Sequence, residues 1–264
     1  MQKKTSLLQK EWDKVEKKEK EYLQKRARKR ESGFHQFLEK KVPANLQDTL
    51  NTAFSKAFYL VFEKGTAVIE KTYRKEEMQK NYRINEFAAQ VKNNKKSLNV
   101  FSQKAAGAGG VNLVLSGVSG IGMGVLGIGI PDIALFTGLM LKSIYETALH
   151  YGFDYEEEKE KKFILLLIKG ALSYGEELKQ IDREINAYME TGIWQEKKEL
   201  DAYIKDASGC LSGELLYMKF LQGIPIAGAV GGAYDVVYLK QILTYTQLKY
   251  RRRFYLKYSK INYS

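Results

Sequence analysis

Proline and cysteine are both scarce in this chain of 264 residues. The three prolines, Pro43, Pro131 and Pro225, leave long uninterrupted stretches between them, and proline is the residue that most strongly interrupts a helix. The single cysteine, Cys210, excludes an internal disulfide and fits a reducing compartment. Together with the helical periodicity described below, these scarcities predict an all-α protein.

A hydrophobic leader is also lacking. The N-terminal sequence is dominated by lysine and glutamate and has no apolar run of the kind that a signal peptide needs. We therefore expect a cytoplasmic protein.

Charge is absent from residues 105–131. This stretch is 27 residues long and nine of them are glycine, although a glycine inside a helix costs about 0.5–1 kcal/mol relative to alanine. A tight helix–helix contact offsets that cost, because missing side chains let two backbones approach closely, and a seven-residue spacing keeps small residues on one side of a helix. The expected helix-packing residues are Gly110, Gly117, Gly120, Gly124 and Gly127 here, and Gly228 and Gly232 in a second small-residue run.

The same stretch is long enough to cross a membrane, which takes about 20 mostly apolar residues. We favour a compact multi-helix bundle with a glycine-rich apolar helical hairpin at its centre. Contact of this segment with lipid, or a full membrane span, stays open as an alternative. Asn112, Ser116 and Ser119 argue against a lipid-facing helix.

Positive charge gathers at the two ends of the chain. The net charge is +12, of which residues 1–30 carry +7 and residues 249–264 carry +6, whereas residues 156–206 carry −4. Basic ends attract polyanions such as anionic lipid, nucleic acid or an acidic protein.

Residues 1–33 are predicted to form a basic N-terminal helix. Trp12, Val15 and Tyr22 lie near one stripe of it, with lysines and arginines elsewhere. Such a helix either lies on a membrane surface or packs one narrow face on the rest of the protein.

Residues 34–250 are predicted to form a single helical domain. Gly152 fits the position that follows a helix C-terminus. The sequence G-I-P occurs twice, each time before an apolar helix, and we expect those two helices to be neighbours. Helices are expected at 45–73, 75–92, 132–150, 156–177, 178–206 with a break near Gly192, 209–222 and 226–250, and residues 98–106 lead into the glycine-rich stretch.

Residues 251–264 are predicted to be a basic aromatic tail. Rings interleaved with basic residues are typical of a lipid interface, but they also occur in nucleic-acid binding segments and in solvated helix ends. The residues expected to bind lipid or a partner are Lys249, Arg251, Arg252, Arg253, Phe254, Tyr255, Lys257 and Tyr258.

Several motifs resemble the EcsC family. They are G-I-G-I-P-D at 127–132, A-L-H-Y-G-F-D at 148–154 and G-I-P-I-A-G-A-V-G-G-A-Y at 223–234, and the resemblance covers residues 40–255. Asp235 stands where the family pattern has asparagine. The resemblance implies a bacterial helical protein that is either cytosolic or membrane-associated, with an ABC transporter as a candidate partner, and it implies no set of catalytic residues.

A catalytic or metal site has only weak candidates. Glu146 and His150 lie four residues apart and share a helix face, and Asp132 and Asp154 flank the same helix. A carboxylate–imidazole pair can bind a metal or act as a general base, but metal sites normally need three or four ligands. We favour a structural histidine at a helix C-terminus, where the helix dipole stabilises its proton.

The favoured function is therefore binding to an anionic membrane surface or a membrane protein on the inner face of the cell membrane. No cofactor and no small-molecule substrate is predicted, and nucleic acid is the less favoured partner. An enzyme centred on Glu146 and His150 is the alternative class.

Overall fold

The computed structural model describes residues 2–27, 44–65, 69–71, 73–92, 94–108, 131–196, 198–221 and 233–263. Over these residues the chain forms nine α-helices and one short π-helix and contains no strand, which confirms the all-α prediction. The hairpin predicted within residues 105–131 lies outside them except at its two ends, and so do all seven glycines expected to pack helices.

The helices follow the predicted order. They are α1 (Gln2–Ala27), α3 (Ala44–Leu60), the π-helix η1 (Val61–Gly65), α5 (Lys75–Lys92), α6 (Lys95–Ala108), α8 (Pro131–His150), α9 (Glu158–Leu172), α10 (Gly175–Thr191), α11 (Leu200–Leu221) and α12 (Ala233–Tyr263).

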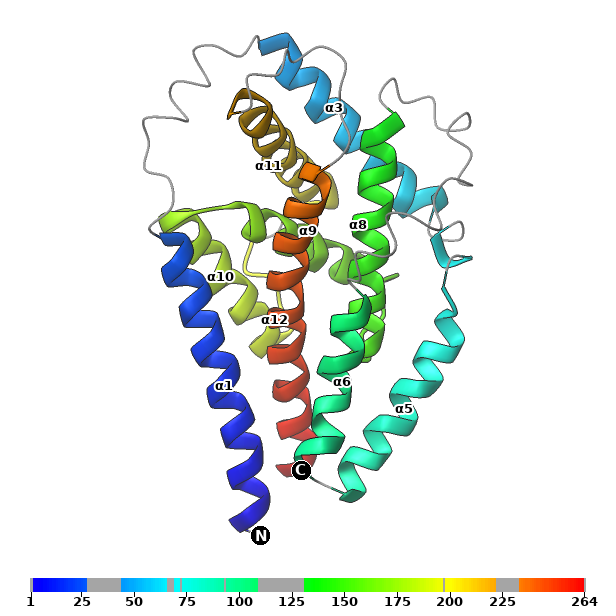
Figure 1. The fold of residues 1–264 in the computed structure, drawn as a ribbon, viewed down its shortest axis with the longest axis vertical. Coiled ribbons are helices and arrows are strands. Elements are labelled where there is room, and N and C mark those ends of the chain that lie inside the picture. Colours follow the sequence, from blue (N-terminus) through cyan, green and yellow to red (C-terminus); the bar gives the residue numbers. More distant parts are fainter. Residues whose placement is uncertain are drawn as a thin grey trace.

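The bundle is elongated, and α12 runs along its long axis (Figure 1). It packs against α1 on one side and against α6 and α8 on the other, with α9 and α10 also in contact. At the far end of the molecule α3 packs on α11. The contact between α8 and α12 confirms that the two helices preceded by G-I-P are neighbours.

The core is densest around α9. Residues 163–168 of this helix read FILLLI and every one of them is at most 3% exposed. A helix that is apolar on all faces has to be surrounded by others, and α9 contacts α10, α11 and α12.

Several predicted helix boundaries are wrong. The break expected between residues 206 and 209 is absent, since α11 runs without interruption from Leu200 to Leu221. The helix expected at 156–177 ends at Leu172, and α10 begins at Gly175, whose φ of +56° breaks the helical path. The helix expected at 45–73 gives way to η1 after Leu60. The break at Gly192 is confirmed, since this residue caps α10 with a φ of 73°.

The predicted separate tail is also wrong. Residues 251–263 continue α12 without a break, and the side chains of residues 251–259 lie mostly inside the bundle. The domain boundary expected at residue 250 therefore falls in the middle of a helix.

Candidate functional site

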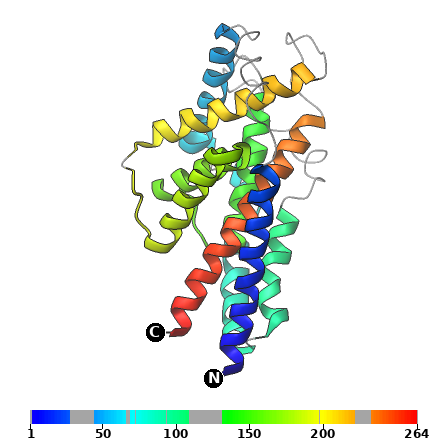
Figure 2. The ribbon, with the colours of Figure 1, turned by 90° about the vertical axis from the view of Figure 1, so that its left-hand side faces the viewer.

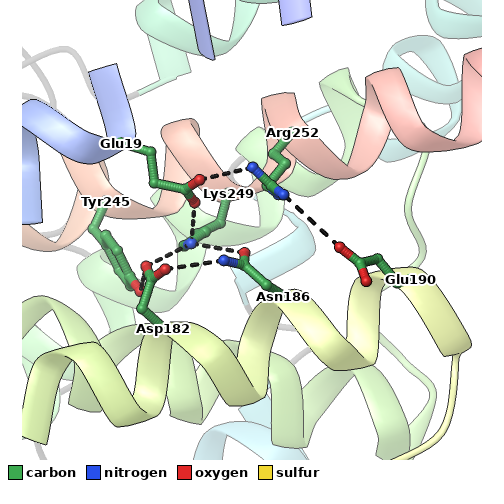
Figure 3. Close-up of polar contacts among 7 residues, drawn as sticks. All are labelled: Glu19, Asp182, Asn186, Glu190, Tyr245, Lys249 and Arg252. Atoms are coloured by element: carbon green, nitrogen blue, oxygen red, sulfur yellow. Dashed lines mark hydrogen bonds and ion pairs between the residues drawn. The ribbon is translucent and has the colours of Figure 1, made fainter. Parts of the chain in front are cut away.

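Lys249 lies at the centre of a buried polar cluster between α1, α10 and α12 (Figure 3). Its side chain is fully buried and its ammonium forms ion pairs with Glu19 of α1 and Asp182 of α10. The ammonium also donates a hydrogen bond of 2.9 Å to the Asn186 side chain. Tyr245 donates a 2.7 Å bond to Asp182. One cation thus holds carboxylates from two other helices.

Arg252 extends this cluster toward the surface. Its Nη1 lies 2.8 Å from the second carboxylate oxygen of Glu19, and its Nη2 lies 3.8 Å from Glu190. The guanidinium carbon lies 4.6 Å from the ring centre of Trp12 on α1, a cation–π geometry. The two helices are therefore joined by charge and by aromatic stacking at the same point.

The two arginines beside Arg252 bind other carboxylates, one on α1 and one on α9. Arg251 reaches Glu11 of α1 at 3.0 Å. Arg253 binds both carboxylate oxygens of Glu160 on α9, at 2.8 and 2.7 Å, and Tyr250 donates a 2.6 Å bond to the same carboxylate. Each arginine in the Arg251–Arg253 run thus has an acidic partner inside the protein.

The aromatic residues beside these arginines are buried as well. Phe254, Tyr255 and Tyr258 are 1%, 3% and 2% exposed, and the ring of Phe254 lies 4.5 Å from that of Phe101 on α6. Of the eight residues predicted to bind lipid or a partner, only Lys257 has a largely open side chain, at 42%. The charges and rings of this segment are thus paired and packed within the fold, and their binding to lipid or a partner stays a prediction.

The first helix is also packed into the bundle. Its inner face buries Glu11, Val15, Glu19 and Arg26, and Arg26 donates two hydrogen bonds to the Ser173 carbonyl. The structure thus shows one narrow face of this helix packed on the rest of the protein, which is the second of the two alternatives expected from the sequence. The outer face carries exposed lysines at positions 10, 14, 17, 18, 20 and 25.

Glu146 and His150 lie on the same face of α8, as their spacing predicts, and both are largely buried. Burial raises the pKa of Glu146 above its usual range. Burial, with help from the charge of Lys104, lowers the pKa of His150 to about 4. Desolvation, which favours the neutral ring, therefore outweighs the stabilisation of the protonated imidazole that was expected from the helix terminus.

A metal centre finds no support in the described part of the chain, where no three His, Cys, Asp or Glu side chains form a group that could hold an ion. Asp154 is exposed and accepts a hydrogen bond from the Glu156 amide. The side chain of Asp132 lies outside the described residues. The catalytic role of Glu146 and His150 stays a prediction.

A second polar cluster was not predicted from the sequence. Tyr73 donates to Tyr155 at 2.6 Å, and Tyr155 donates in turn to Glu70. Lys75 binds the same glutamate at 3.1 Å, and Tyr145 stacks on Tyr155 with ring centres 4.0 Å apart. Burial and the hydrogen bond to Glu70 raise the pKa of Tyr155 far above its usual range, so this tyrosine stays protonated. Its contacts connect the turn after α8 with α8 itself and with the start of α5.

The surface of α5 holds the least expected feature. Ile84, Phe87 and Val91 are 55%, 69% and 67% exposed, and their spacing of three and four places them on one face of the helix. The opposite face buries Tyr82 and Ala89. The exposed stripe could have been inferred from the sequence, since α5 has apolar residues on two faces and only one of these faces is buried in the core.

Cys210 has no features of a reactive thiol. Burial raises its pKa to about 12, which leaves almost no thiolate at neutral pH.

The geometry so far defines a helical bundle held together by internal ion pairs, with no catalytic constellation among the described residues. In a family comparison, the model of the EcsC protein family matches residues 8–255. The chain therefore belongs to the EcsC family. It is also similar to the uncharacterized protein YdbA of Bacillus subtilis (strain 168), at 30% identity over 148 residues, which is 53% of this chain and 52% of that protein. The match thus spans about half the length of this relative, and no solved structure matches the chain.

Proposed function

We propose that the protein attaches to the anionic inner surface of the cell membrane through α5 and the end of the bundle beside it. The observation that carries the proposal is the exposure of Ile84, Phe87 and Val91 on one face of α5. An exposed apolar stripe on an amphipathic helix is typical of an interaction surface, and such a helix binds the boundary between headgroups and acyl chains.

The charge around the stripe favours anionic lipid as the partner. Lys80, Arg83, Lys92, Lys95 and Lys96 are all exposed on α5 and at the start of α6. The sequence from Phe87 to Pro131 contains no acidic residue. A basic residue close to an anionic membrane contributes about 1 kcal/mol.

The neighbouring ends of α1 and α12 add to this charge. Figures 1 and 2 place the start of α1, the turn between α5 and α6 and the end of α12 at the same end of the molecule. Residues 2–10, 87–99 and 255–263 together contain eight lysines and no acidic residue. This end is therefore the one that an anionic surface attracts most strongly.

The attachment is peripheral in this proposal. Among the helices that the structure describes, none has both the length and the apolar character required to cross a bilayer. The apolar contribution comes from three side chains on one helix face, and salt-sensitive attraction of the lysines adds to it.

The test is flotation with vesicles of phosphatidylcholine alone and of phosphatidylcholine mixed with phosphatidylglycerol, at low and high salt. We expect binding to the anionic vesicles, weakened by salt. Replacing Ile84, Phe87 and Val91 by serine should weaken binding about tenfold or more, because three apolar side chains lose their contact with lipid.

The matched control is Ile193→Ser, which removes an apolar side chain that is 70% exposed at the end of α10, and it should bind like the parent protein. Equal flotation of the α5 variant and the parent would contradict the proposal. Concentration-dependent self-association lost in the α5 variant would identify a second copy as the partner instead. Binding to native membranes but not to protein-free vesicles would point to a membrane protein.

A further inference from the structure

The two buried carboxylates of α1 both form ion pairs with basic side chains of α12. Glu11 binds Arg251 at 3.0 Å. Glu19 binds Lys249 through one oxygen and Arg252 through the other (Figure 3). The helix thus places two anionic groups against three cations on one stretch of α12.

The two arginines do not use their full binding capacity in this arrangement. Each offers a single terminal nitrogen to its α1 carboxylate, whereas a guanidinium binds an oxyanion best through two parallel N–H groups. The Nε atoms of Arg251 and Arg252 are buried, and neither has a hydrogen-bond acceptor among the residues that the structure describes. These two N–H groups are therefore still able to donate hydrogen bonds to an anion with more oxygens than a carboxylate.

The attachment of α1 combines these ion pairs with the side chains of Leu7, Leu8, Trp12, Tyr22 and Leu23, which are partly buried against the core. Three of the four positions that the helix buries most deeply, Glu11, Glu19 and Arg26, are charged, and only Val15 is apolar. A buried ion pair roughly breaks even, because desolvation offsets the attraction. In the described part of the chain α1 packs mainly on α10 and α12, so its departure leaves the contacts among the other helices in place.

We propose that the stretch of α12 that carries Lys249, Arg251 and Arg252 is a binding site for phosphate groups, and that α1 is an internal cover of this site. The carboxylates of Glu11 and Glu19 occupy the site until a phosphate-bearing ligand replaces them. Lys249 keeps Asp182 as a partner when α1 leaves, so no buried ammonium is stranded. The phosphate belongs either to a lipid headgroup or to a free anion, and the inference does not depend on the α5 surface.

Trp12 is a natural reporter of this exchange, because its ring stacks on Arg252. The chain has two tryptophans, so a Trp194→Phe background leaves Trp12 as the only one. We expect its emission to shift to the red when α1 leaves and the indole enters water. Pyrophosphate without vesicles tests the free anion, phosphatidylglycerol vesicles test the headgroup, and phosphatidylcholine vesicles are the neutral control.

Replacing Arg251 and Arg252 by glutamine should raise the ligand concentration at which this shift is half complete, by about tenfold for each arginine. Lys257→Gln is the matched control on the same helix and should leave the response unchanged, because Lys257 faces Glu86 of α5 rather than α1. Circular dichroism shows whether each variant is folded.

A second variant serves if the double arginine variant does not fold. Replacing Glu11 by glutamine removes one carboxylate of the cover while the site stays intact, and the shift should then occur at a lower ligand concentration. A shift with pyrophosphate or only with anionic vesicles supports the inference and identifies the source of the phosphate. No shift with any ligand, or an unchanged shift in both variants, would overturn it. Loss of flotation in the α5 variant with an intact Trp12 response would separate the two proposals.

Discussion

The ring of Tyr82 on α5 lies directly against the backbone of Gly152, in the turn that ends α8. A Cβ atom at position 152 would lie 2.2 Å from Cζ of Tyr82, and Gly152 has a φ of 77°. Left-handed backbone of this kind is costly for residues with a side chain, and the contact leaves no room for one. The turn in A-L-H-Y-G-F-D, the family motif, therefore has a structural reason for its glycine.

Gly152→Ala is expected to destabilise the protein by about 2–4 kcal/mol, the sum of backbone strain and the clash with Tyr82. Urea denaturation followed by circular dichroism measures the change. The control is Gly213→Ala in α11, where a Cβ meets nothing within 4 Å; there we expect no loss and a gain of up to about 1 kcal/mol from helix propensity. Equal stability of the Gly152 variant and the parent would refute the argument.

Lys249→Met is expected to cost about 3–5 kcal/mol, because Asp182 loses its cation and Glu19 keeps only Arg252 as an ion-pair partner. Thermal and urea unfolding measure the loss. Adding Glu19→Gln to the same variant should cost less than Glu19→Gln does alone, since the Lys249–Glu19 ion pair is already broken. Lys257→Met removes a largely open lysine and should have an effect within about 0.5 kcal/mol. A purely additive double variant would show that Lys249 and Glu19 are not coupled.

His150 should make stability depend on pH in a defined window. Its folded pKa of about 4 lies below the value of 6.5 for an exposed histidine. Between these values the unfolded chain binds a proton at this residue and the folded protein does not. Stability therefore falls as the pH drops from 6.5 toward 4, and this contribution levels off below pH 4.

The size of this effect is about 2 kcal/mol once partial exposure of the ring is taken into account. Urea unfolding of the parent and of His150→Gln at several pH values tests it, since His35 is present in both proteins. The difference in free energy of unfolding between the two should change across this window. A constant difference from pH 7 to pH 4 would show that the folded protein protonates His150 as easily as the unfolded chain.

Much of the fold could be predicted from local sequence. The range expected for α5 is correct to the residue, and α8 begins one residue earlier than expected, at Pro131. Proline suits the first position of a helix and glycine suits the turn after one, so these boundaries are local properties. The boundary between α9 and α10 was missed because Ser173 and Tyr174 lack a strong helix-ending signal before Gly175.

The role of the basic C-terminal segment could not be predicted in the same way. Rings interleaved with arginines look alike whether their partners are lipid headgroups or carboxylates of the same chain. Lys249 and Glu19 are 230 residues apart in sequence, and no periodicity connects them. The exposed stripe on α5 was missed for a related reason, because two apolar faces on one helix do not show which of them the core covers.

The sequence by itself determined the class of this protein: long periodic stretches with few prolines can only bury their apolar stripes as packed helices. Its charge distribution also determined that the two ends of the chain would be basic. Only the tertiary structure decided what those charges do. Ion pairing depends on distances of a few ångströms between residues far apart in the chain, and packing α1 and α9 against α12 turned the arginines inward. The same packing left the apolar face of α5 in contact with solvent.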